Sequence, residues 1–153
     1  MYTLKIIKEG DIFCVQWYKN DKFVTGGTMD ASEESFIDFC ARMEQKTREM
    51  EIEDSLKLIR EKHMSLKLKK GDLVRVRSWD EMAEIWGLEG YSIQIIQIPN
   101  FFTSEMSVLC GKVYSVKDVD ENGDIYLNGG DTHSWIFSPA MLIKLDHNLK
   151  EAE

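Results

Sequence analysis

The stretch that decides the fold lies near the middle of the chain and reads Leu66-Lys67-Leu68-Lys69-Lys70-Gly71-Asp72-Leu73-Val74-Arg75-Val76-Arg77. Apolar and polar residues alternate along it around a Gly-Asp turn, which is typical of a half-buried β-strand. The pattern returns at short intervals in Ser92–Ile98, Lys112–Val116, Ile125–Leu127 and Trp135–Phe137. Because several short strands at this spacing indicate a barrel or sandwich, the sequence predicts a small antiparallel β-barrel over residues 65–147, with a tail at 148–153.

Before this stretch, the first 28 residues alternate in the same way and predict a three-stranded antiparallel meander. The Lys-Asn-Asp-Lys run at 19–22 suits a tight hairpin, because Asn and Asp adopt positive φ at low cost. A helix should follow, capped by Asp30 or Ser32, with Glu33 and Glu34 in its first turn. Its predicted buried stripe is Phe36, Phe39, Cys40, Met43 and Met50.

A charge-rich run from Arg48 to Lys62 links the two halves. Its apolar breaks at Ile52, Leu56 and Ile59 fit a helix that either continues or restarts near residues 54–55, and a long exposed helix could also mediate a homodimer. Residues 1–64 are therefore expected to hold the meander, the amphipathic helix and a helical connector. The fold class is α+β.

Composition favours a protein partner over nucleic acid. Nineteen Lys and Arg residues face 27 Asp and Glu residues, for a net charge of -8, which opposes general attraction to phosphate backbones. An acidic surface instead suits a basic partner, including the nucleic-acid channel of another protein. With 43% apolar residues the chain should fold.

The sequence shows no signal-peptide core, no membrane span and no paired-cysteine motif, so we expect a cytoplasmic protein without cofactor or metal. Residues 118–124 begin like a calcium loop, but Gly129 stands where a bidentate glutamate belongs. A type I′ hairpin turn at Asn122-Gly123 explains this segment better. The histidines His63, His133 and His147 fit no metal or catalytic motif.

Two candidate binding surfaces remain. One is the strand face that would carry the basic cluster Lys67, Lys69, Lys70, Arg75 and Arg77, a nucleic-acid contact in the alternative interpretation. The other is loop material rich in aromatic and acidic residues, where aromatic anchors would engage a basic protein or peptide. Its partner-binding candidates are Trp79, Asp80, Glu81, Glu84, Trp86, Tyr91, Phe101 and Phe102, of which Trp86 and Phe102 could instead cap the barrel core.

The order of signals in the second half is Lys70-Gly71-Asp72, Phe102 through Met106, Cys110-Gly111-Lys112-Val113, Asn122-Gly123, and Trp135-Ile136-Phe137-Ser138-Pro139 with Met141-Leu142. This order resembles the small SH3-like barrels of phage and prophage proteins, related in pattern to the repeats of mind bomb-type ubiquitin ligases. The first half is similar to the HicB-like antitoxin fold. The resemblance implies an adaptor-like module that contacts protein, and it carries over no catalytic residue.

We therefore expect a non-catalytic protein-binding module of phage or mobile-element type. Its specific version is an anti-CRISPR-like inhibitor that occupies the basic surface of a host defence nuclease. The first alternative is a nucleic-acid-binding regulatory module that uses residues 67–77. The second is a small metal-dependent hydrolase that uses Asp118, Asp120, Asp124 or His133.

Overall fold

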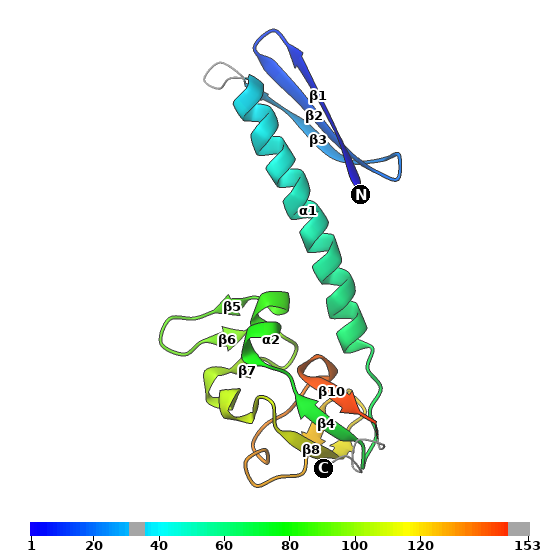
Figure 1. Cartoon of the computed structure of the whole chain (residues 1–153), viewed down its shortest axis with the longest axis vertical. Coiled ribbons are helices and arrows are strands. Elements are labelled where there is room, and N and C mark those ends of the chain that lie inside the picture. Colours follow the sequence, from blue (N-terminus) through cyan, green and yellow to red (C-terminus); the bar gives the residue numbers. More distant parts are fainter. Residues whose placement is uncertain (31–35, 147–153) are drawn as a thin grey trace. The chain divides into compact units, whose positions relative to one another are not determined.

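A computed structural model describes residues 1–30 and 36–146 (Figure 1). The chain divides into two compact units, Met1–Lys57 and Leu58–Glu153, called here the first and second units. The sequence placed a boundary near Ser65, at the end of the helix α1 (Phe36–Met64), whereas the contacts divide the chain within that helix. Four residues considered in the sequence analysis lie outside the described residues: the expected cap Ser32, the first-turn acids Glu33 and Glu34, and His147.

The first unit contains the predicted meander, which the structure confirms. The strands β1 (Tyr2–Glu9), β2 (Ile12–Lys19) and β3 (Lys22–Asp30) form an antiparallel sheet in the order β1-β2-β3. Asn20 and Asp21 turn the second hairpin with φ of 50° and 61°, as their residue types predict. A register shift between Trp17 and Tyr18 leaves an irregularity near the start of β3.

The core of the first unit joins β2 to α1. Phe13, Val15 and Trp17 alternate along β2 on the buried face, and Phe39 and Met43 come from the helix. The rings of Phe13 and Phe39 stack with their centroids 4.1 Å apart. In the predicted stripe, Met50 packs on this core and Cys40 is half-buried. Phe36, in the first described turn of the helix, is 41% exposed, and its ring centroid lies 5.5 Å from that of Phe13. The helix continues through residues 54–55 without a restart.

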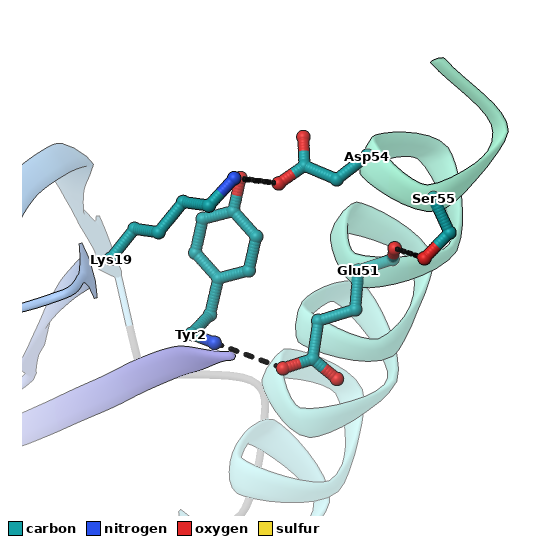
Figure 2. A network of polar contacts seen from close by, with 5 residues as sticks. All are labelled: Tyr2, Lys19, Glu51, Asp54 and Ser55. Carbon is teal, nitrogen blue, oxygen red and sulfur yellow. Dashed lines mark hydrogen bonds and ion pairs between the residues drawn. The ribbon is translucent and has the colours of Figure 1, made fainter. Parts of the chain in front are cut away.

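A polar network fastens the ends of β1 and β2 to the helix (Figure 2). Asp54 Oδ2 accepts from the hydroxyl of Tyr2 at 2.8 Å and from Lys19 Nζ at 2.6 Å. The backbone N–H of Tyr2 donates to Glu51 Oε1 at 2.9 Å. Farther along, Trp17 Nε1 donates to Thr47 Oγ1 at 2.9 Å, which satisfies the polar atom of a buried ring.

The second unit is built from short antiparallel strands, so the mixed α+β class is confirmed. The strands β4 (Leu73–Val76), β8 (Val113–Val119), β9 (Ile125–Leu127) and β10 (Leu142–Leu145) form one sheet in the order β10-β4-β8-β9. The strands β5 (Leu88–Glu89), β6 (Ile95–Ile96) and β7 (Phe102–Thr103) form another. Within residues 58–146 these sheets do not close into one barrel, so the coarser antiparallel architecture is what the structure shows.

Several predicted strands are shorter than expected. The strand expected over residues 66–77 spans Leu73–Val76, because the buried carboxylate of Asp72 accepts from Lys69 N at 2.9 Å and holds a turn before it. The strand expected over residues 92–98 is reduced to Ile95–Ile96. In residues 135–137 a single bridge joins Phe137 to Ile125. The strand β10 follows the short 3-10 helix η2 (Pro139–Met141).

Two turn predictions are corrected. The segment expected as a loop is the two-turn helix α2 (Trp79–Trp86), where Ser78 Oγ accepts from Glu81 N at 3.2 Å and Gly87 follows the last residue. Gly123 has a φ of 83° but Asn122 has no positive φ, so the type I′ turn is wrong. Instead, Asp120 Oδ1 accepts from the backbone N–H groups of Asn122 and Asp124, each at 2.9 Å.

The second unit packs around its own core, whose larger members include Met82, Ile96, Phe102, Leu109, Phe137 and Met141. Met106 and Leu109 reach this core from the 3-10 helix η1 (Ser104–Leu109). Among residues 1–30 and 36–146, no helix combines the length and apolar content that crossing a membrane would require.

Candidate functional site

The aromatic residues predicted to bind a partner divide into support and surface. Phe102 is fully buried, so it belongs to the core. Trp79 and Trp86 are half-buried at the two ends of α2 and pack against the same core, with the Trp79 ring centroid 6.1 Å from that of Phe102. These three residues therefore attach α2 and β7 to the core of the second unit, and contacts with a partner fall to the exposed side chains nearby.

The last turns of α1 also support α2, which the sequence did not suggest. Arg60 Nε donates to the carbonyl of Ile85 at 2.7 Å, and its guanidinium lies over the Trp86 ring at 5.8 Å. One helical turn later, His63 has a buried Nδ1 without a hydrogen-bond partner in the described structure. Burial lowers the pKa of the His63 imidazole, and the nearby Arg77 cation lowers it further.

Tyr91 is the most exposed aromatic residue described, and it lies in the tight turn between β5 and β6. Gly90 has a φ of 101°, and a side chain there would bring a Cβ within 2.1 Å of the carbonyl oxygen of Ile93. The turn therefore requires glycine beside the exposed tyrosine. Leu88 and Ile93 are exposed on the same hairpin. Together, the exposed residues Leu88, Glu89, Tyr91 and Ile93 form what we call the hairpin surface.

Phe101 occupies the next turn of this small sheet, so it does not lie beside Tyr91. The turn after β6 carries Pro99 and then Asn100, whose φ of 70° suits a type II turn. Phe101 itself has a φ of 54° and is 56% exposed, a costly conformation for a bulky residue. Asn100 Nδ2 donates to Asp124 Oδ1 at 2.9 Å and anchors this turn to the β8–β9 loop.

Acidic side chains accompany the hairpin surface. Asp80 and Glu84 are exposed on α2, and Glu89 is exposed on β5, where it accepts from Gln97 Nε2 at 3.0 Å. None of these three carboxylates forms an ion pair with another residue that the structure describes. Glu81 differs, because its Oε1 accepts from Arg77 Nη1 at 2.7 Å. Two of the three predicted acids, Asp80 and Glu84, are thus open to a partner, as is Glu89, which the sequence did not single out.

The predicted basic cluster does not line one strand face. Three of its members precede β4, namely Lys67, Lys69 and Lys70. Arg75 is exposed on β4. Arg77 follows β4 directly and forms an ion pair with Glu81. A continuous cationic face would need one strand through all five residues, and the strand covers only Leu73–Val76. Arg75 points away from the core residues Val74 and Val76, as a solvated strand position should.

The acidic loop and His133 are also placed. The Asp120 carboxylate is occupied by backbone donors, and His133 Nδ1 lies 2.6 Å from the carbonyl oxygen of Gly130 in a separate turn. No group of three or more His, Cys, Asp or Glu side chains suited to a metal occurs in the part of the chain that the structure describes.

Comparison of this chain with protein-family models and with curated proteins finds no match. Sequence reasoning did not single out Leu88, Glu89 or Ile93. Ile93 was missed because it was assigned to the strand expected to begin at Ser92. The Gly90-Tyr91-Ser92 run was the available signal, since Gly and Ser between apolar residues favour a turn.

Proposed function

We propose that this protein is a non-catalytic binding module whose partner is another protein with a basic surface. The observation that carries the proposal is Tyr91, fully exposed in a turn that requires glycine at its neighbour. Exposed aromatic side chains on a rigid support are common interface anchors, because they bury much area at little cost in rotamer freedom. A tyrosine held this way favours contact with a partner over a role in folding.

Charge supports a basic partner. The exposed carboxylates of Asp80, Glu84 and Glu89 precede the anchor Tyr91 in sequence, and the whole chain has a net charge of -8. Such a charge distribution raises the rate of encounter with a cationic surface, and this attraction weakens as the salt concentration rises. Phe101, exposed at the other turn of the same sheet, would add a second anchor.

The finer descriptions from the sequence belong to the same proposal. We assign the second unit to the SH3-like class on the order of its turn and core residues, and the phage character and cytoplasmic location rest on the sequence as well. The specific version is inhibition of a host defence nuclease through its nucleic-acid channel. If the purified protein leaves the cutting rate of such nucleases unchanged, the nuclease-inhibitor proposal is rejected. The general binding role is tested separately.

The general role is tested with the full chain as bait in a host lysate. Tyr91→Ala and Phe101→Ala should each weaken capture of the specific partner by about tenfold or more, since anchor residues commonly contribute at least 1.4 kcal/mol. Val108→Ala is the matched control, because Val108 is an exposed apolar residue on η1 of the same unit. Identical capture by all four proteins would reject this surface.

A further inference from the structure

The outer edge of β3 differs from the outer edge of β1. Both are edge strands in the order β1-β2-β3. β1 carries Lys5 and Lys8 within its length, and its first N–H is taken by Glu51. β3 has charged residues at its two ends, Lys22 and Asp30, and none between them. Lysines are a common device against strand addition, so β1 is protected and β3 is not.

The face of β3 on the helix side is also open. Thr25, Gly27 and Met29 lie opposite Trp17, Val15 and Phe13, so they share the face that α1 covers over β2. Over β3 that face is a groove, lined by Val15, Trp17, Thr25, Gly26, Gly27, Met29, Met43 and Lys46. A Cβ placed on Gly27 would meet nothing within 4 Å. The groove therefore has room for a side chain from outside this unit.

We propose that β3 pairs with β3 of a second copy of this chain, antiparallel and with Gly27 on the two-fold axis. The irregularity near Val24 leaves Thr25–Asp30 as the regular part of the strand, and a centre at Gly27 uses its first five residues. In this register Met29 of each copy lies opposite Thr25 of the other, on the helix side. Each methionine then covers the other copy's groove, and glycine leaves the axis uncrowded.

Charge is compatible with a second copy as the occupant. Antiparallel pairing about Gly27 places no like charges opposite each other, because residues 25–29 are uncharged. The meander itself is balanced, with four lysines and four acidic residues in residues 1–30, so the net charge of -8 arises elsewhere in the chain. The sheets can therefore meet without the repulsion that the total charge suggests.

Sedimentation equilibrium across a concentration series tests the pairing in the full chain. We expect the wild type to form dimers, and Gly27→Lys to raise the dissociation constant by about tenfold or more, because two like charges would face each other at the axis. Gly27→Ala should have a much smaller effect, and Thr3→Lys, on the outer face of β1, should have none. A wild type that stays monomeric, or a dimer that Gly27→Lys leaves intact, would overturn the proposal.

Hydrogen exchange of the wild type gives a test that needs no variant. Amide exchange in residues 25–29 should slow as the concentration passes the dissociation constant, while exchange in β1 stays constant. Protection that appears in another segment, such as the exposed part of α1, would place the dimer contact there and reject the β3 pairing.

Discussion

The hydroxyl of Tyr2, in the first residue of β1, donates to Asp54 Oδ2 on α1 at 2.8 Å, and this contact closes a loop of 52 residues in sequence. Lys19 donates to the same oxygen from the end of β2. One carboxylate therefore ties two neighbouring strand ends to the helix that covers them.

The pH dependence of the first unit should follow from Asp54. The hydrogen bond from Lys19, and then that from Tyr2, lowers the pKa of Asp54 below its ordinary 3.8. The unfolded chain takes up this proton first, so the stabilisation is present above about pH 4 and is lost as pH falls through the folded pKa. Asp54→Asn should lower the melting temperature at neutral pH and have little effect in acid. Equal losses at both pH values would contradict this account.

His63 should give the second unit an acid sensitivity of its own. Its lowered pKa means that the unfolded state binds the proton first, so stability falls as pH drops below about 6.5 toward the folded pKa. The neighbouring charges are Arg77, Lys62 and Glu81, and Glu81 alone opposes the shift among the groups that act on His63. Urea unfolding at about pH 7.5 and 5.5 should show a smaller difference for His63→Gln than for the wild type. His133→Gln is the control, because it removes an exposed histidine that lies outside α1.

Gly90, in the turn that carries the hairpin surface, should be sensitive to substitution. Gly90→Ala must be accommodated both at a φ of 101° and against a carbonyl oxygen 2.1 Å from the new Cβ, so we expect a loss of about 1–3 kcal/mol in the free energy of unfolding and weaker partner binding. Gly130→Ala is the matched control, because its Cβ would meet nothing within 4 Å at an ordinary φ. Chemical denaturation measures both. A Gly90→Ala protein as stable as the control would show that the turn relaxes.

The neighbours Phe101 and Phe102 should respond in opposite ways. Phe102→Ala empties a fully buried site and should cost about 3–5 kcal/mol of unfolding free energy. Phe101→Gly removes an exposed ring and relieves a left-handed φ of 54°, so stability should be unchanged or raised by up to about 1 kcal/mol. Binding should fall in Phe101→Gly all the same. Strong destabilisation by Phe101→Gly would mean that this ring serves the fold.

The elements that the sequence predicted well have a strong local period. The meander is one, because Phe13, Val15 and Trp17 alternate without interruption and Asn20-Asp21 supply the turn. The alternation that begins at Leu66 forms a strand only after the predicted Gly-Asp turn, because Asp72 bonds to the backbone of Lys69 and holds residues 69–72 in that turn. The helix Trp79–Trp86 was predicted as a loop because its aromatic content was given more weight than its capping residues. Ser78 and Glu81 have the spacing of a capping box, which indicates the start of a helix.

The candidate site was predicted by residue type more successfully than by position. Aromatic and acidic residues marked the segment, but the adjacent residues Phe101 and Phe102 differ in burial. Phe102 begins β7 with its ring in the core, whereas Phe101 lies in the preceding turn with a φ of 54°. Pairing such neighbours correctly requires the register between β6 and β7, where Ile96 lies opposite Phe102. That register depends on contacts distant in sequence, which local patterns do not contain.

The unbroken helix α1 limits how this chain can be dissected. A cut after Lys57 would leave each fragment with a frayed helix end, and a cut after Met64 would remove Arg60 and His63 from the α2 that they support. Proteases need an extended segment several residues long, which a continuous helix does not offer. Fragments made at either point therefore contain units that have lost native contacts. In a genetic screen, truncation of either half would abolish function, whichever half binds the partner.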